Sequence, residues 1–255
     1  MSEAGNGSMG LEGQVALVTG ASSGLGKAVS IALAAAGADV SLVARSEEDL
    51  REVESEISGS GRRALTLPTD LAGEMGPPRA VERTVETFGR IDVLVNAAGT
   101  DAPGRVEDLA VEGWDRTLAV NLRAPFLLCK AAFPYMREAG HGTIVNVSSV
   151  AGKKGWANAS AYCASKFGLA GFTQALADEG RSHGIRACII YPGAMATNWG
   201  SWSPEDRQGS ANAEPSPSQA LPPSEVAAFI VWLAAAPPEF VLTEGIIMPI
   251  EESLP

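Results

Sequence analysis

The chain has 255 residues, of which 45% are hydrophobic and 19% are charged, and its formal net charge is -11. This size and composition are typical of a globular protein with a substantial core, built as one large α/β domain or two small ones. The acidic excess disfavours binding to nucleic acids and to anionic membranes, and no apolar run approaches the ~20 residues that a bilayer requires.

Short runs rich in β-branched residues alternate with longer helical patterns along the chain. In chain order, the predicted elements are a strand at 14–19, a helix at 24–36, a strand at 39–44, a helix at 46–57, a strand at 64–67, a helix at 79–88, a strand at 91–96, a helix at 114–137, a strand at 143–147, a helix at 160–181, a strand at 185–191, a helix at 225–235 and a closing strand at 245–249. Ser46 is the predicted N-cap of the second helix. This alternation, with continuous apolar strands, predicts a parallel sheet covered by helices on both faces.

The domain organisation follows from the absence of repeats and of a composition break. We therefore expect residues 11–255 to form a single domain, preceded by a disordered tail at 1–10. That tail lacks the basic start and apolar centre of a signal peptide. Residues 198–223 are rich in Ser, Pro and Ala, and a stretch of this length with little regular structure is either a substrate lid or disordered.

The cysteines and histidines bear on location and on metal binding. Cys129, Cys163 and Cys188 are far apart and form no CxxC pair. This usage predicts neither a disulfide framework nor a zinc site, and it is typical of the reducing cytoplasm, where we expect the protein. Because the two histidines do not cluster, we expect no metal site.

A glycine-rich turn follows the first predicted strand. From Thr19 to Gly26 it reads TGASSGLG, with the spacing G-x-x-x-G-x-G, and it leads directly into a helix. Glycines permit a sharp turn and the close approach of a pyrophosphate, and the helix N-terminus offers free N–H groups. A purely structural turn is the alternative, but the strand-turn-helix context favours dinucleotide binding. The candidate residues here are Gly20, Ser22, Ser23, Gly24, Leu25 and Gly26.

The end of the second predicted strand bears on the choice of dinucleotide. An acidic residue there would bind the ribose 2′-hydroxyl of NAD and repel the 2′-phosphate of NADP. The sequence has Ala44 and Arg45 instead, so NADP is favoured and NAD remains possible. The alternative is that Arg45 is a surface residue at a helix start, neutralised by Glu47, Glu48 and Asp49.

Tyr162 and Lys166 lie four residues apart on a predicted helix and therefore share a face. A free tyrosine, with a pKa of about 10, is a poor base at neutral pH. A neighbouring ammonium and a bound nicotinamide cation are expected to lower that pKa, so that the phenol can exchange a proton with a carbonyl or alcohol oxygen. Ser149 ends the fifth strand, at the edge where ligands bind in such sheets, and can hold the same oxygen.

Together these motifs resemble those of the short-chain dehydrogenase/reductase family, over about residues 11–197. The matching motifs are TGxxxGxG at 19–26, Asp70 after the third strand, NAAG at 96–99, Asn121 in the long helix, Ser149, the Tyr162–Lys166 pair and PGxxxT at 192–197. The resemblance implies a doubly wound Rossmann fold with a mostly seven-stranded parallel sheet and helices on both faces. It also implies a homotetramer, with a homodimer as the alternative, assembled mainly through the helices at 114 and 160.

The resemblance further implies residue roles. Tyr162 would be the acid/base, Lys166 would bind the nicotinamide ribose and lower the tyrosine pKa, Ser149 would orient the substrate oxygen, and Asn121 would hold a water in a proton relay to Lys166. By sequence alone Ser148 is a rival to Ser149, and the family spacing to Tyr162 selects Ser149. Besides the glycine-rich turn, the implied cofactor contacts are Arg45, Asp70, Leu71, Asn96, Ala97, Ala98, Gly99, Tyr162, Lys166, Pro192, Gly193, Met195 and Thr197.

The sequence therefore predicts an oxidoreductase that transfers hydride between NADP, or less favourably NAD, and a small carbonyl or secondary alcohol. Trp156, Trp199 and Trp202 either line an apolar pocket or pack the lid onto the body. Two rivals are an epimerase or dehydratase on the same fold, which usually has a longer chain, and a silent dinucleotide-binding sensor or scaffold, which typically lacks the Tyr or the Lys. The segment from Glu244 to Ile250 departs from the strand and Asp-Gly-Gly ending of many members.

Overall fold

Seven parallel strands form one sheet, as the sequence predicts, and their order in the structure is β3-β2-β1-β4-β5-β6-β7. The computed structural model describes residues 10–197 and 220–250. The strands are β1 (Val15–Thr19), β2 (Asp39–Ala44), β3 (Ala64–Pro68), β4 (Val93–Asn96), β5 (Gly142–Val147), β6 (Ile185–Pro192) and β7 (Glu244–Ile247). The closing strand at 245–249 is thus confirmed, displaced slightly toward the N-terminus. The predicted tail at 1–10 and lid at 198–223 lie almost entirely outside the described residues.

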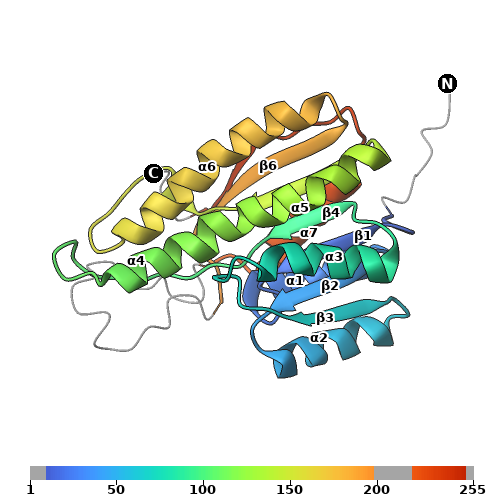
Figure 1. The fold of residues 1–255 in the computed structure, drawn as a ribbon, viewed down its shortest axis with the longest axis horizontal. Coiled ribbons are helices and arrows are strands. Elements are labelled where there is room, and N and C mark those ends of the chain that lie inside the picture. Colours follow the sequence, from blue (N-terminus) through green and yellow to red (C-terminus); the bar gives the residue numbers. More distant parts are fainter. Residues whose placement is uncertain (1–9, 198–219, 251–255) are drawn as a thin grey trace.

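Helices cover both faces of the sheet. They are α1 (Gly24–Ala35), α2 (Glu47–Gly59), α3 (Gly76–Phe88), α4 (Val111–Leu118), α5 (Ala124–Ala139), α6 (Ser160–Arg181) and α7 (Pro223–Ala235), with the short turns η1 (Ala119–Arg123) and η2 (Val150–Gly152). Figure 1 shows α3, α5 and α6 in front of the sheet and α1 and α7 behind it. Within the described part of the chain, no helix is long and apolar enough to cross a membrane.

The sheet separates two apolar cores. One joins α1, α2 and α7 to one face of the strands, and includes Val29, Leu33 and Ile230. The other joins α3, α5 and α6 to the opposite face, and includes Leu128 and Met136. Strands β1, β4 and β5 are buried along their whole length, which explains why they read as continuous apolar runs and not as alternating ones.

The long helix predicted at 114–137 is interrupted in the structure. Between α4 and α5 the chain forms a π-helical turn, η1, closed by the Ala124 N–H bonding to the Ala119 carbonyl. Pro125 has no N–H to donate to the carbonyl of Asn121 four residues earlier, which favours this irregularity. The prediction of one regular helix was wrong at this point, and the interruption falls on the candidate residue Asn121.

The order of the strands locates the binding crevice. The chain runs outward from β1 to β3 and then crosses back to β4, on the other side of β1. In such sheets ligands bind beyond the carboxyl ends of the strands, where the winding direction reverses. The turn after β1 and the segments after β4 and β5 meet at this edge, and they carry the sequence-predicted motifs.

Candidate active site

The glycine-rich turn after β1 is shaped so that only glycine fits at its key positions. Gly20 and Gly24 have positive φ values of 70° and 52°, a region that side chains disfavour. A Cβ atom on Gly26 would lie 2.2 Å from the Gly20 carbonyl oxygen, so α1 begins in direct contact with the turn. The N-cap residue Ser23 makes no side-chain capping bond, so the first N–H groups of α1 are not satisfied by a side-chain cap, as phosphate binding requires. This observation fits a dinucleotide.

Beside this turn lies a cavity of about 590 Å³. Among its lining residues are the predicted cofactor residues Gly20, Ser22, Ser23, Arg45, Asp70, Leu71, Ala98 and Gly99. Sequence reasoning missed the other lining residues, which are Ala44, Ser46, Asp49, Thr69, Thr100, Arg116 and Val120. The lining residues come mostly from the segments that follow β1, β2, β3 and β4, so the cavity extends along the ends of four strands. This arrangement fits an elongated ligand such as a dinucleotide better than a compact one.

Charged groups gather at the β2–β3 end of this cavity. Asp70 accepts a hydrogen bond from the Ala72 N–H at 3.1 Å and pairs with Arg116 at 3.3 Å. The Ala72 bond, the bond from Arg116 and the charge of Arg45 all lower the pKa of Asp70. Two guanidinium groups, of Arg45 and Arg116, and two carboxylates, of Asp49 and Asp70, thus line the cavity where the sequence predicts the adenosine end of the cofactor. Ser46 caps α2 by accepting from the Asp49 N–H at 3.3 Å, which confirms its predicted role.

The NAAG segment is fixed by hydrogen bonds to a side chain at the end of β1. Thr19 Oγ1 accepts hydrogen bonds from the N–H groups of Ala97 and Ala98, at 3.1 and 3.0 Å. Asn96, predicted to contact the cofactor, is only 2% exposed, and its Nδ2 donates to Asn146 Oδ1 at 2.7 Å. Its side chain does not line the cavity, because β4 places it under the sheet edge. The prediction of a cofactor contact fits Ala98 and Gly99, and the Asn96 side chain supports them.

Tyr162 and Lys166 lie on the first turns of α6, and both are buried. The Lys166 Nζ donates to the Val147 carbonyl at 2.8 Å and lies 5.5 Å from the centre of the Tyr162 ring. Ser149 follows β5 and hydrogen-bonds to Tyr162. Its rival Ser148 is turned away, since its hydroxyl donates to the Lys166 carbonyl at 3.3 Å. The structure therefore brings together the predicted Ser149, Tyr162 and Lys166.

Burial shifts the pKa values of both members of this pair. Burial raises the pKa of Tyr162 above its ordinary value, and only its hydrogen bond with Ser149 lowers it. Burial also lowers the pKa of Lys166 to about 8. For the protein alone, burial dominates the pKa of Tyr162, and the expected lowering by Lys166 together with a bound nicotinamide stays a prediction. The phenol is protonated at neutral pH and is poised to donate.

Asn121 acts on the backbone around it. Its Oδ1 accepts from the Thr100 N–H at 2.8 Å, and its Nδ2 donates to the Thr100 carbonyl at 2.8 Å and to the Ser165 hydroxyl at 3.0 Å. Both amide hydrogens are thus in use, so the side chain has none left to donate to a relay water. The structure shows Asn121 as the clamp that fixes the loop after β4 to α6.

The PGxxxT segment lies across the crevice from the glycine-rich turn. Pro192 ends β6, and the Gly193 N–H donates to the Ile247 carbonyl at 2.8 Å. Met195 pairs with Leu221 as an isolated bridge. The methyl carbon of Thr197 lies 3.4 Å from where a Cβ on Gly24 would stand. Thr197 is therefore next to the start of α1, and its contact with the nicotinamide stays a prediction.

Comparison with known proteins decides the family. A sequence model described as short chain dehydrogenase matches residues 14–208. The chain belongs to the short-chain dehydrogenase/reductase family. It is 37% identical over 226 residues to D-threitol dehydrogenase of Mycolicibacterium smegmatis, covering 88% of this chain and 87% of that protein. It is 36% identical over 240 residues to a 3-oxoacyl-[acyl-carrier-protein] reductase of Synechocystis, covering 91% and 94%.

A solved structure supports the same assignment. A metagenomic short-chain oxidoreductase in complex with NADP is 36% identical, with a TM-score of 0.79 over 93% of this chain and 98% of that one. Like other members of the short-chain dehydrogenase/reductase family, this chain is an oxidoreductase acting on carbonyl and alcohol groups with a nicotinamide dinucleotide. The alternative hypothesis of a silent dinucleotide-binding sensor or scaffold has no support from these relatives, which are a dehydrogenase and a reductase.

Proposed function

We propose that Tyr162 is the acid/base of this oxidoreductase and that Ser149, Lys166 and Asn121 organise the site around it. The observation that carries the proposal is the burial of the Tyr162 phenol beside Ser149, with the Lys166 ammonium group 5.5 Å from its ring. A phenol whose pKa is raised by burial stays protonated at neutral pH and can donate to a carbonyl oxygen. When bound, the nicotinamide supplies or accepts the hydride.

Each residue has a defined task in this scheme. The Tyr162 hydroxyl donates its proton to the substrate oxygen as negative charge develops there, and the Ser149 hydroxyl donates a second hydrogen bond to that oxygen. Lys166 is anchored to the Val147 carbonyl, and it favours the phenolate that remains. Asn121 holds Thr100, and hence the floor of the crevice, in place.

The test is NADPH oxidation in the presence of a panel of ketones. Tyr162→Phe keeps the ring but removes the proton donor, so kcat should fall by about 10²–10⁴-fold. Tyr135→Phe, at an exposed position on α5, is the matched control and should retain activity. Equal activity of Tyr162→Phe and the wild type would remove Tyr162 from the mechanism.

We also propose that NADP is preferred over NAD. Arg45 and Arg116 line the end of the cavity next to β2, where a 2′-phosphate needs cationic partners, and the metagenomic relative was solved with NADP. Arg45→Ala should raise the KM for NADPH more than the KM for NADH. An equal change for both cofactors would remove the role of Arg45.

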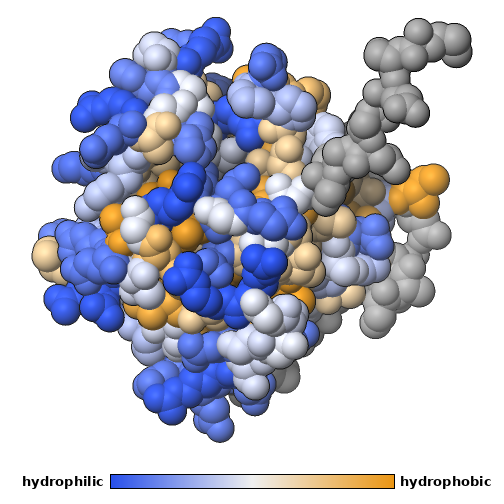
Figure 2. Space-filling view, turned by 90° about the vertical axis from the view of Figure 1, so that its right-hand side faces the viewer, coloured by the Kyte–Doolittle hydropathy of each residue, from blue (hydrophilic) through white to orange (hydrophobic). Residues whose placement is uncertain are grey.

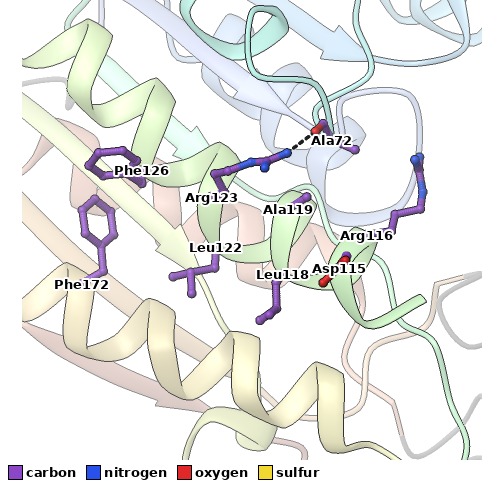
Figure 3. Close-up of a pocket in the computed structure, with 9 residues that line it drawn as sticks. All are labelled: Ala72, Asp115, Arg116, Leu118, Ala119, Leu122, Arg123, Phe126 and Phe172. Carbon is purple, nitrogen blue, oxygen red and sulfur yellow. Dashed lines mark hydrogen bonds between the residues drawn. The ribbon is translucent and has the colours of Figure 1, made fainter. Parts of the chain in front are cut away.

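An apolar hollow on the outer surface bears on whether copies of this chain associate. The outer surface of α4, α5 and α6 carries a hollow of about 800 Å³ lined by Leu118, Leu122, Phe126 and Phe172 among others. Figure 3 shows Phe126 and Phe172 facing each other, with ring centres 5.9 Å apart, and Arg123 donating to the Ala72 carbonyl. Because Phe126 is 43% exposed, we propose that a second copy covers this surface in a homodimer or homotetramer. Light scattering should show smaller particles for Phe126→Asp; unchanged particles would exclude this surface.

The remaining expectations concern organisation and location. We propose that residues 11–255 form one catalytic domain, since all described strands join one sheet, with 198–223 as its lid. We also propose a cytoplasmic location, supported by the three buried free cysteines, whose thiols are not paired with one another.

A further inference from the structure

The loop that follows the NAAG segment carries a carboxylate, Asp101, directly after the residues that line the dinucleotide cavity. Gly99 and Thr100, immediately before it, line the dinucleotide cavity. Asn121 holds Thr100 by two hydrogen bonds of 2.8 Å, one accepted from the Thr100 N–H and one donated to the Thr100 carbonyl. On the other side, the Gly104 N–H donates to the Asn158 carbonyl at 2.9 Å, and Gly104 pairs with Ala159, just before α6. Asp101 is therefore fixed between the cavity and the helix that carries Tyr162.

The Asp101 side chain is desolvated but has little compensation. It is partly buried, and its Oδ1 accepts one hydrogen bond, of 2.7 Å, from the neighbouring Ala102 N–H. No cationic side chain within residues 10–197 and 220–250 forms an ion pair with it. Burial raises the pKa of Asp101 to about 6, so at pH 7 most of it is charged. An ionised carboxylate can accept about four hydrogen bonds, and the Ala102 N–H supplies one of them.

The charge of Asp101 also reaches the reacting group. The Gly104–Ala159 bridge, three residues before Tyr162, holds this loop against the start of α6, and the charge of Asp101 contributes to the raised pKa of Tyr162. A substrate whose oxygen meets Tyr162 therefore presents its neighbouring atoms to Asp101. A donor group on the substrate would satisfy the carboxylate, an apolar group would leave it desolvated and unpaired, and an anionic group would be repelled.

We propose that Asp101 is a specificity-determining residue that accepts a hydrogen bond from a second hydroxyl of the substrate. The enzyme would then prefer hydroxyketones and diols over simple ketones and alcohols. This proposal rests on the proposed function. A neutral hydroxyl is favoured over an ammonium group because it satisfies the carboxylate without the desolvation of a second charge. The hydroxyl lies close to the reacting carbon, since Asp101 and Tyr162 approach the same part of the crevice.

The experiment compares matched substrate pairs that differ by one hydroxyl. NADPH-dependent reduction is measured at pH 7 for butan-2-one and 3-hydroxybutan-2-one, for cyclohexanone and 2-hydroxycyclohexanone, and for acetophenone and 2-hydroxyacetophenone. For each pair the ratio of kcat/KM values, hydroxyketone over ketone, is determined in the wild type, Asp101→Ala and Asp101→Asn. The control is Asp108→Ala, which removes an exposed carboxylate from the same loop.

We expect a wild-type ratio of at least about tenfold in one or more pairs, because a site that hydrogen-bonds a hydroxyl rejects the analogue without it. Asp101→Ala should reduce that ratio about tenfold, mainly through the hydroxyketone, with the simple ketone changing less than about threefold. Asp101→Asn keeps one acceptor oxygen and should retain part of the preference. Asp108→Ala should leave the ratio unchanged.

Two results would overturn the proposal while leaving the proposed function intact. One is a wild type that reduces simple ketones and hydroxyketones equally well. The other is an Asp101→Ala variant whose ratio equals that of the wild type, or that loses activity equally on both members of each pair. If the wild type reduces no member of the panel and does not differ from Tyr162→Phe, the proposed function itself fails and the role of Asp101 fails with it.

Discussion

Asp92 and Asp101 flank β4, one before its first residue and one after its end, and they lie at opposite edges of the sheet. Asp92 is 2% exposed and accepts hydrogen bonds from the Val15 N–H, from Arg90 and from His141, at 2.7–2.8 Å. Asp101 accepts a single bond from its own neighbour, Ala102. Among the residues that the structure describes, the buried Asp92 forms ion pairs at the edge where the strands begin, whereas Asp101 and Lys166 form none at the edge where they end.

The paired carboxylate stabilises the fold, whereas the carboxylate without an ion pair belongs to the proposed active site. The bonds of Asp92 tie together the starts of β1, β4 and β5, so its charge serves the fold. Figure 2 looks onto this end of the molecule, whose surface is mainly hydrophilic with small apolar areas between. At the other end, burial moves the pKa of Asp101 up to about 6 and that of Lys166 down to about 8, and such shifts are typical of active sites.

The largest stability effect is expected at the paired edge. Asp92→Ala leaves the buried Val15 N–H without its partner and removes the anchor of Arg90 and His141, so the free energy of unfolding should fall by about 2–4 kcal/mol. Urea unfolding measures this change. Asp178→Ala, on the exposed surface of α6, is the control and should change stability by less than about 0.5 kcal/mol. A similar small change for Asp92→Ala would mean that the paired edge does not stabilise the fold.

At the unpaired edge, removal of a charge should stabilise the protein. The folded pKa of Lys166 is below its ordinary value, so folding is penalised wherever the ammonium is charged, and the penalty disappears as pH rises from about 8 towards 10.5. Lys166→Met should therefore raise the free energy of unfolding at pH 7 by about 1–2 kcal/mol, after allowing for the lost bond to the Val147 carbonyl. The gain should shrink at pH 10. A destabilised variant at pH 7 would contradict the assigned cost of the buried ammonium.

A smaller gain is expected at Asp101. Its folded pKa is above the ordinary value, so the penalty is fully present above about pH 6 and is lost as pH falls toward 4. Asp101→Asn should raise the free energy of unfolding by about 1 kcal/mol at pH 7.5, discounted for the partial exposure of the side chain. Denaturant unfolding at several pH values provides the measurement. A gain that does not vary with pH would show that charge is not its cause.

Much of this arrangement is predictable from the sequence because it depends on local patterns. The strands read as apolar runs, Ser46 reads as an N-cap, and the glycine-rich turn and the Tyr162–Lys166 spacing indicate the cofactor edge. The structure shows the strands, the Ser46 cap and the sharp glycine turn at these positions, and it brings Tyr162 and Lys166 together. They require only neighbours in sequence, or a face shared along one helix.

Other features depend on contacts between distant segments, and the sequence did not reveal them. The Asn96 side chain is buried because β5 brings Asn146 beneath it, and Asn121 is committed to Thr100 because η1 turns it toward the loop after β4. The raised pKa of Tyr162 follows from how deeply α6 packs. Pro125 is the one local signal that would have predicted the break in the long helix. Asp101 has no motif, and only the folded loop places it near Tyr162.

The central claim is that hydride reaches a carbonyl carbon while Tyr162 protonates its oxygen. The direct measurement uses NADPH carrying deuterium at the transferable position, with a reducible ketone, and analyses the product by mass spectrometry. The wild type should form an alcohol with one deuterium on the carbinol carbon, and Tyr162→Phe should form about 10²–10⁴-fold less of it while still binding NADPH. An unlabelled alcohol, or equal yields from the two proteins, would contradict the account.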